Sequence, residues 1–430
     1  MRQFRQRWSV GAALGLVAVL AACAGGEGGG QSVDNGELPV VLAAVQQRVE
    51  PTIADARDVE AVGAATTRFA VELYRQVSKG LAGENVVIGP YSAWLALAMA
   101  SVGAAGTTAE EMVTALGFPL DEGRLLPAVN ALDRGLAHRA DDDAVKFTVA
   151  NRLWGQQGTE FLAPFLDSLV THFGAPLVAA DFAGDAEAAR AQINGWVDGR
   201  TENKIPELFP AGTLSESVRL ALINAMYLDA PWEFAFDPAQ TTTGTFTRAD
   251  GSKVDVPFMQ YDQYLPTAYS QEWQAVELPY EGGGLSMVVI VPRDFNQFEA
   301  GLDSAKLERI LGQIKDGGIH LSLPRFSFST HSSLVQPLQG MGMRSAFGEG
   351  ADFSRMIAGG GLYIDAVEHE AFIEVDESGT EAAAATGVSM AGSHGPTISV
   401  ASPFLFLIRD KATDTTLFIG RVLDPLASAP

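Results

Sequence analysis

The spacing of apolar and polar residues changes character along the chain. Most of the first half repeats its apolar residues every three or four positions, the period of amphipathic helices. Later segments are runs of β-branched and aromatic residues bounded by Gly and Pro, which predict strands. The predicted helices cover 61–79, 91–103, 107–116, 121–138, 159–173 and 184–199, and the predicted strands cover 145–154, 218–228, 274–279, 285–291, 318–328, 362–376, 404–409 and 415–421. A helix-rich half followed by a strand-rich half predicts an α+β fold, with helices packed around antiparallel sheet.

Residues 61–430 are expected to form one large domain. No Pro-, Gly- or Ser-rich linker and no shift in composition divides them, and 47% hydrophobic residues are ample for a substantial core. Residues 33–60 show only a weak helical pattern around 42–49. The segment 23–60 is therefore interpreted as a Gly-rich tether and an N-terminal extension.

The first 22 residues have the character of a secretory signal peptide. Three arginines precede an apolar run over 10–22, which is too short to span a bilayer as a stable helix. The sequence Leu20-Ala21-Ala22-Cys23 resembles the bacterial lipobox, in which the cysteine is lipidated and becomes the mature N-terminus. The alternative is that Cys23, the only cysteine of the chain, is a thiol that happens to end the signal peptide. We expect a secreted protein, lipid-anchored at the periplasmic or extracellular face of a bacterial membrane.

Charge and missing motifs exclude several function classes. The formal net charge is −23, which opposes nucleic-acid binding. His369-Glu370 lacks the second histidine of a zinc-protease motif, and Ser92 lacks the closing glycine of a nucleophile elbow. We therefore expect no enzyme activity, no cofactor and no metal; an unrelated secreted hydrolase is the least supported class.

Residues 377–387 are small residues behind an acidic start. At period two, Thr380, Ala382, Ala384 and Thr386 share one face, as a strand that slides into a packed sheet requires. A helix is the alternative, because Ser378 and Glu381 form a capping-box pattern ahead of four alanines. Such a helix would be short, since Gly387 interrupts it after about two turns. Local reasoning leaves helix and loop both open.

Several blocks of sequence, in matching order, resemble the serpin family. They lie at 85–118, 222–241, 276–292, 340–356 and 403–422, and the resemblance covers roughly residues 61–425. The segment 374–387 resembles the hinge of the serpin reactive-centre loop, and serpin loop insertion is a known form of β-strand addition. The resemblance implies the serpin fold: helices around a large, mainly antiparallel sheet, smaller sheets and an exposed reactive-centre loop.

The resemblance also implies a function. Inhibitory serpins trap a serine, or in some cases cysteine, protease as an acyl-enzyme when the cleaved loop inserts into the main sheet. The partner would be a protease, and the protein is expected to be a monomer. The implied hinge residues are Glu377, Gly379, Thr380, Glu381, Ala382, Ala383, Ala384, Ala385 and Thr386. The alternative is a non-inhibitory serpin that acts as a surface binding protein; such members tend to carry proline, charge or bulk in the hinge.

The implied reactive bond has three candidate positions. Counting from Glu377 gives Ser393–His394, counting back from Pro403 gives Gly392, and Met390 is the only large side chain nearby. Small residues at these positions favour a protease with a narrow, elastase-like or subtilisin-like pocket. The absence of Arg and Lys between 388 and 402 argues against trypsin-like proteases.

Four further residues match serpin positions that control opening of the main sheet. Asn224 and His369 match residues that hydrogen-bond beneath the opening point, and Ser92 matches a second polar member of that cluster. Trp232 matches the aromatic residue at the top of the sheet, where the loop enters. Gly89 replaces a serine that is common in the family, which raises the question of whether the cluster is looser here.

The lipobox predicts a mature chain that begins at a lipidated Cys23. Mass spectrometry of the native protein should find a diacylglyceryl-modified N-terminal cysteine, and Cys23→Ser should abolish membrane attachment. An unmodified N-terminus, or a Cys23→Ser variant that stays on the membrane, contradicts the prediction.

Overall fold

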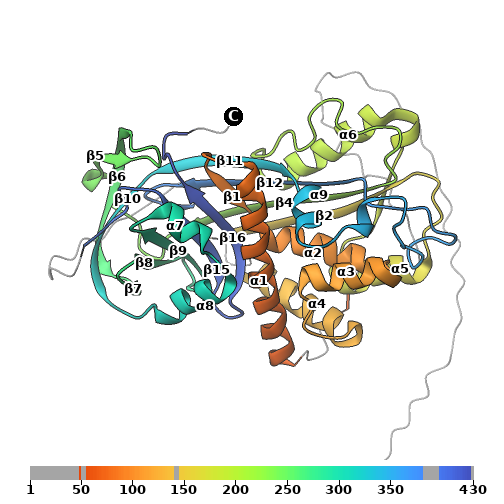
Figure 1. Cartoon of the computed structure of the whole chain (residues 1–430), viewed down its shortest axis with the longest axis horizontal. Coiled ribbons are helices and arrows are strands. Elements are labelled where there is room, and N and C mark those ends of the chain that lie inside the picture. Colours follow the sequence, from red (N-terminus) through yellow and green to blue (C-terminus); the bar gives the residue numbers. More distant parts are fainter. Residues whose placement is uncertain (1–47, 50–54, 140–144, 381–396, 428–430) are drawn as a thin grey trace, which may run out of the picture. The chain divides into compact units, whose positions relative to one another are not determined.

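The computed structural model describes residues 48–49, 55–139, 145–380 and 397–427, all within a compact unit that spans Pro39–Pro430 (Figure 1). Its helices are α1 (Ala56–Gly80), α2 (Pro90–Ser101), α3 (Gly106–Leu116), α4 (Glu122–Arg139), α5 (Ala163–Ser168), α6 (Phe182–Arg200), α7 (Phe295–Ala300), α8 (Ser304–Gln313) and α9 (Val335–Gly340). Three shorter turns are η1 (Leu169–Phe173), which is π-helical, and the 3₁₀ turns η2 (Pro238–Gln240) and η3 (Ser345–Phe347).

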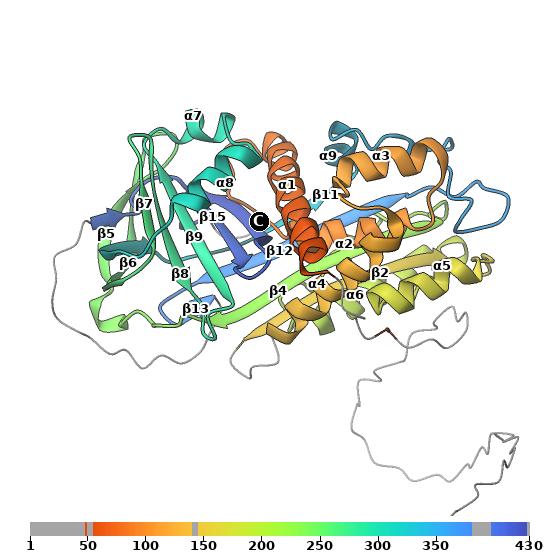
Figure 2. The ribbon, with the colours of Figure 1, turned by 90° about the horizontal axis from the view of Figure 1, so that it is seen from below.

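The main sheet lies between two layers of helices. Its strands, in spatial order, are β11 (Phe326–Ser333), β12 (Ala366–Val375), β13 (Gly379–Thr380), β4 (Leu220–Pro231), β2 (Lys146–Gln156) and β3 (Val178–Ala180). Most neighbours are antiparallel, but β12 also pairs directly with β4, and in parallel. Helix α6 lies on one face of the sheet, and α2, α3 and α4 cover the other (Figures 1 and 2).

Two further sheets pack at the end of the unit away from α3 to α6. One has the order β1 (Val86–Ile88), β16 (Thr415–Val422), β15 (Phe404–Asp410), β9 (Leu285–Pro292), β8 (Trp273–Pro279) and β7 (Thr267–Tyr269). The other has the order β14 (Thr397–Ser399), β10 (Gly318–Pro324), β6 (Lys253–Tyr264) and β5 (Thr242–Thr247). Every residue of β9 and β16 is buried, which explains why most of both strands is apolar, with Ser286 the one polar side chain of β9.

Helix α2 is the centre of the helical layer. Its residues from Pro90 to Ala100 are all buried, as expected for a helix that is apolar on every side. Pro90 stands at the first helical position, where its missing N–H costs nothing. The indole N–H of Trp94 donates to the carbonyl of Leu116 at 2.9 Å and ties α2 to the end of α3. This helix supports the main sheet from below at the point where β12 and β4 meet.

The α+β prediction is confirmed, and each predicted helix and strand has a counterpart. Two predicted elements are divided in the structure. The predicted helix 159–173 is divided into α5 and the π-helical η1, and the predicted strand 318–328 is divided at Arg325 into β10 and β11, which belong to different sheets. Helix α1 also begins at Ala56, before the expected domain boundary at 61. Within the described part of the chain, no helix has the length and apolar character needed to cross a membrane.

Several elements escaped the sequence analysis. The short helices α7 and α9 have six residues each, too few for a helical period to emerge, and strand β5 is rich in Thr and Gly with a single buried Phe246. Strand β3 of the main sheet was missed as well, because three residues are too few to show a period. Helix α8 and the long strand β6 also had no predicted counterpart.

Candidate functional site

The predicted hinge enters the main sheet as a two-residue strand. Gly379 and Thr380 form β13, in which Thr380 lies opposite Val375 of β12 on one side and Ala230 of β4 on the other. Thr380 is only 2% exposed. The residue expected to lead insertion is therefore already inside the sheet in this structure.

The direct pairing of β12 with β4 stops short of this strand. It runs from Ala366 opposite Ala221 to Ala371 opposite Met226. Between that point and β13, residues 372–374 and 227–229 have no described partner in the facing strand. We call the line along which β12 and β4 face each other the seam. Its lower end, at Ala366–Ala371, is closed by direct pairing of the two strands, and its upper end, at Val375, is closed by the hinge residues of β13.

A tight turn delivers the hinge to the seam. The Asp376 carboxylate accepts from the backbone N–H groups of Ser378 at 2.7 Å and Gly379 at 3.2 Å. A Cβ atom on Gly379 would lie 2.2 Å from the carbonyl oxygen of Ala230, a distance that no side chain tolerates. Glycine at this position is therefore required by close approach to β4.

Glu377 anchors the turn through its buried carboxylate, which pairs with the exposed Arg325. Its carboxylate accepts from Nε of Arg325 at 2.8 Å and from the hydroxyl of Thr241, while its backbone carbonyl accepts from the N–H of Phe236 at 2.9 Å. Burial disfavours the charged carboxylate, but the bonds from Arg325 and Thr241 outweigh it and hold the pKa of Glu377 below its usual value. The side chain of Glu377 is 6% exposed and that of Arg325 is 44% exposed.

Trp232 forms the wall against which the hinge lies. Its indole N–H donates to the carbonyl of Asp376 at 2.9 Å, and its backbone N–H donates to the carbonyl of Ser378 at 2.9 Å. Its ring stacks on Tyr280 with 4.7 Å between centroids, and the Tyr280 hydroxyl lies 2.6 Å from that of Thr380. Trp232 thus contacts the first described residues of the hinge at the end of the seam that β13 closes.

His369 and Asn224 meet across the lower part of the seam. They are register partners on β12 and β4, and Nδ1 of His369 is hydrogen-bonded to Oδ1 of Asn224. Nε2 of His369 accepts from the backbone N–H of Gly89 at 2.9 Å, so the proton of this neutral ring is on Nδ1. Burial, followed by the nearby His331, lowers the pKa of His369 to about 3. The backbone of Gly89 thus supplies a donor to the histidine despite the loss of the family's serine.

Ser92 belongs to a neighbouring pair rather than to the His369 bond. Its hydroxyl donates to Oδ1 of Asn151 at 2.6 Å, and the Asn151 amide donates back to the carbonyl of Ser92 at 3.0 Å. Asn151 on β2 lies directly opposite Asn224 on β4. The four predicted sheet-opening residues therefore divide into a lower cluster of Ser92, Asn224 and His369 and a separate upper site at Trp232.

The sequence analysis missed Asn151, Tyr280, Arg325 and Thr241, which contact the predicted residues from distant parts of the chain. Buried polar side chains inside apolar strands were the available signal for Asn151. The other predicted site residues lie outside the described part of the chain: Glu381, Ala382, Ala383, Ala384, Ala385 and Thr386 of the hinge, Met390, Gly392, Ser393 and His394 of the reactive bond, and Cys23. Among the described residues, no cluster of His, Cys, Asp or Glu is arranged to hold a metal ion.

Comparison with known proteins assigns the family. The family model for serpin (serine protease inhibitor) matches residues 64–425. The chain belongs to the serpin family. Leukocyte elastase inhibitor A of Mus musculus is 34% identical to it over 381 residues, which cover 85% of this chain and 100% of that protein.

Solved serpin structures share the fold. The native-state crystal structure of tengpin, a thermophilic serpin, matches with a TM-score of 0.79 and 29% identity over 88% of this chain and 97% of that chain. Human thyroxine-binding globulin, in complex with its ligand, matches with a TM-score of 0.78 and 26% identity over 86% of this chain and 100% of that chain. Because serpins are protease inhibitors and not enzymes, the expectation of no enzyme activity is confirmed.

The anchor of the hinge can be tested by a double-mutant cycle on Arg325→Gln and Glu377→Gln, measured by chemical denaturation. We expect a coupling free energy of about 1–2 kcal/mol, because removing Arg325 leaves a buried carboxylate with Thr241 as its remaining side-chain donor. The exposed pair Arg355–Glu122 is the matched control, with an expected coupling below about 1 kcal/mol. Equal coupling in the two pairs contradicts the assignment of Glu377 as an anchor.

The low pKa of His369 predicts acid sensitivity of the closed sheet. The unfolded side chain has a pKa of about 6.5, so unfolding takes up a proton below that pH and the folded state loses stability as the pH falls. Between about pH 6.5 and about pH 5, the wild type should lose roughly 2 kcal/mol more unfolding free energy than His369→Gln. The neighbouring His331, which pairs with Glu368, is present in both proteins. Parallel stability curves for the two proteins contradict the prediction.

Proposed function

We propose that this serpin inhibits its target protease as a suicide substrate. The protease nucleophile attacks the carbonyl of the reactive bond, the new N-terminal amine leaves, and an acyl-enzyme ester remains. The cleaved loop then inserts between β12 and β4 before water hydrolyses the ester. Displacement of the attached protease distorts its active site, where misplacement by about 1 Å can cost a factor of about 100 in rate.

The observation that carries this proposal is the position of β13. Thr380 already pairs with both β12 and β4, in antiparallel register on each side. Residues two apart in a strand face the same side, so alternate residues beyond Thr380 would follow it into the core. The continued registers place Ala382, Ala384 and Thr386 opposite buried residues of both strands: Ile373, Ala371 and His369 of β12, and Leu228, Met226 and Asn224 of β4.

The same registers bring Thr386 to the level of the bond between His369 and Asn224. That bond joins β12 to β4 directly in the closed sheet. A strand inserted between them must therefore replace it, and the Thr386 hydroxyl can hydrogen-bond to either residue in its place. An inserting strand requires small residues where it enters the core and a polar residue, here Thr386, where it replaces the bond between His369 and Asn224.

The length of the loop from Thr380 to Ser393 also supports the proposal. The 14 residues from Thr380 to Ser393 extend to roughly 45 Å as a strand, and the 12 residues of β4 span roughly 40 Å. Insertion would thus carry the reactive bond along the whole main sheet. The reactive bond remains a proposal at Ser393–His394, with Gly392 and Met390 as alternative positions.

The proposed target is a serine protease with a small or apolar primary pocket, with a cysteine protease as the second class. The small residues around 390–394 favour such a pocket, and relatives of the chain include proteins named leukocyte elastase inhibitors. We further propose that the inhibitor acts as a monomer, lipid-anchored through Cys23 at the outer face of a bacterial membrane. The lipobox and the Gly-rich segment that follows it support this location.

Insertion can be tested with arginine substitutions on the two faces of the proposed strand. Ala382→Arg places a charge between Ile373 and Leu228 in the inserted state, so we expect insertion to slow. Water then hydrolyses the acyl-enzyme before the loop has inserted, and the protease is released. The stoichiometry of inhibition against a protease that forms an SDS-stable complex should rise at least about tenfold. Thr380→Arg is less suitable, because Thr380 is buried in the uncleaved protein as well.

The matched control is Glu381→Arg, one residue earlier. Its side chain would face the same side as Glu374 and Asp229, two partly exposed acids, and should leave the stoichiometry within about twofold of the wild type. If Ala382→Arg inhibits as well as the wild type, the loop does not act by insertion. If no protease in a broad serine and cysteine panel forms a complex, the non-inhibitory alternative is favoured.

A further inference from the structure

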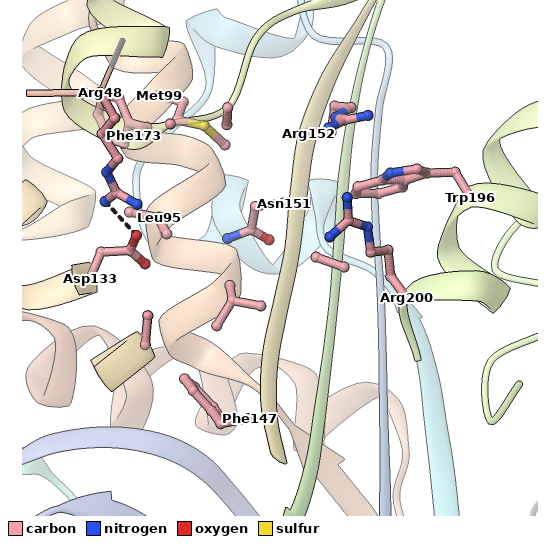
Figure 3. A pocket seen from close by; sticks show the side chains of 15 residues that line it. Arg48, Leu95, Met99, Asp133, Phe147, Asn151, Arg152, Phe173, Trp196 and Arg200 are labelled. Carbon is pink, nitrogen blue, oxygen red and sulfur yellow. Dashed lines mark hydrogen bonds and ion pairs between the residues drawn. The ribbon is translucent and has the colours of Figure 1, made fainter. Parts of the chain in front are cut away.

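A cavity of about 270 Å³ lies at the outer edge of β2 (Figure 3). Strand β3 pairs only with Trp154–Gln156, so the preceding part of β2 has no described strand partner on this side. Ala150, Asn151 and Arg152 of that edge line the cavity, and Trp196 and Arg200 at the end of α6 form the opposite wall. The cavity is separate from the hinge and from the seam between β12 and β4.

Three arginines line the cavity, and they are not equivalent. Arg48 donates to Asp133 at 2.6 Å and to Oδ1 of Asn130 at 2.8 Å, so its charge is neutralised. Arg152 and Arg200 form no ion pair or hydrogen bond with any residue that the structure describes, and Nε of Arg152 is buried. Burial and the charge of Arg200 both lower the pKa of Arg152, which indicates two cations close together without an acid between them.

A neighbouring aromatic residue adds a further unused donor. The guanidinium of Arg152 lies over the ring of Trp196 at 4.7 Å, a contact that uses its face and leaves its N–H groups free. The indole N–H of Trp196 is also buried without a partner in the described structure. Buried donors are normally satisfied, so the unpartnered N–H groups of Arg152 and Trp196, with the exposed guanidinium of Arg200 close by, favour an anionic acceptor at this site.

The other side of the cavity is mixed, because apolar side chains lie there beside Asn151 and the ion pair of Arg48 with Asp133. Leu95 and Met99 of α2, Phe147 of β2 and Phe173 of η1 line its other side (Figure 3). A ligand that fits both parts has a charged head and an apolar body, the usual composition of small-molecule sites.

We propose that this cavity binds a small amphipathic carboxylate. Its head group lies between Arg152 and Arg200, where it accepts charge-assisted hydrogen bonds, and its apolar body lies toward Phe147, Phe173 and Met99. The inference does not rest on protease inhibition, and its test involves no protease.

Isothermal titration of the full chain with sodium octanoate tests the site. We expect saturable binding of one equivalent, with no saturable binding of octanol, which has the apolar body without the charge. Sodium sulfate, which has the charge without the apolar body, should bind at least about tenfold more weakly than octanoate. Sulfate that binds as tightly as octanoate overturns the assignment of an amphipathic ligand.

Two charge-removing variants and one control complete the experiment. Arg152→Gln and Arg200→Gln should each weaken octanoate binding at least about tenfold, because each removes a charge-assisted hydrogen bond. Arg200 is exposed, so its replacement should leave the fold intact. Arg68→Gln removes an exposed arginine of α1 that lies outside the cavity and should bind octanoate like the wild type. Octanoate affinity that is unchanged in both cavity variants, or the absence of saturable binding to the wild type at millimolar concentrations, overturns the proposal.

Discussion

The seam between β12 and β4 is the constraint on which the rest of the structure depends. These two strands pair in parallel only from Ala366 to Ala371, although each continues beyond that point. Two residues of the hinge close the opposite end, with Thr380 buried between both strands. Backbone groups along the open stretch are the pairing sites that an additional strand would satisfy, and such pairing is the source of affinity in β-strand addition.

Closure and insertion compete for the same residues. The bond from His369 to Asn224 holds the two strands together, and α2 supports it through the backbone N–H of Gly89. If the registers of β13 continued on both sides, an inserted Thr386 would reach this same level, so the proposed inserted sheet would exclude this bond. At the top, Glu377 and Trp232 hold the first hinge residues in place while the sheet is closed. The described residues of the hinge are thus fixed at the upper end of the seam.

The sequence predicted the fold class and most of the main sheet, because the spacing of apolar residues follows which residues are buried. Strand β12 alternates between buried and partly exposed positions, and β4 is an almost continuous apolar run. The sequence did not predict the residues that contact the site from distant parts of the chain. Arg325 contacts Glu377 and Asn151 contacts Ser92 across 52 and 59 residues, and no local pattern encodes contacts of that separation. Local preference also left the hinge undecided between helix and loop, whereas its first two residues form a strand, since the neighbouring strands supply the hydrogen bonds.

The central claim is that the uncleaved fold is less stable than the fold with an inserted loop. The most direct measurement is the thermal unfolding temperature of the protein before and after a single cut between residues 387 and 394. A cut chain is ordinarily less stable, because the cut releases a constraint on the unfolded state. The account predicts a higher unfolding temperature after cleavage, as the new strand pairs with β12 and β4. An unfolding temperature at or below that of the intact protein would contradict it.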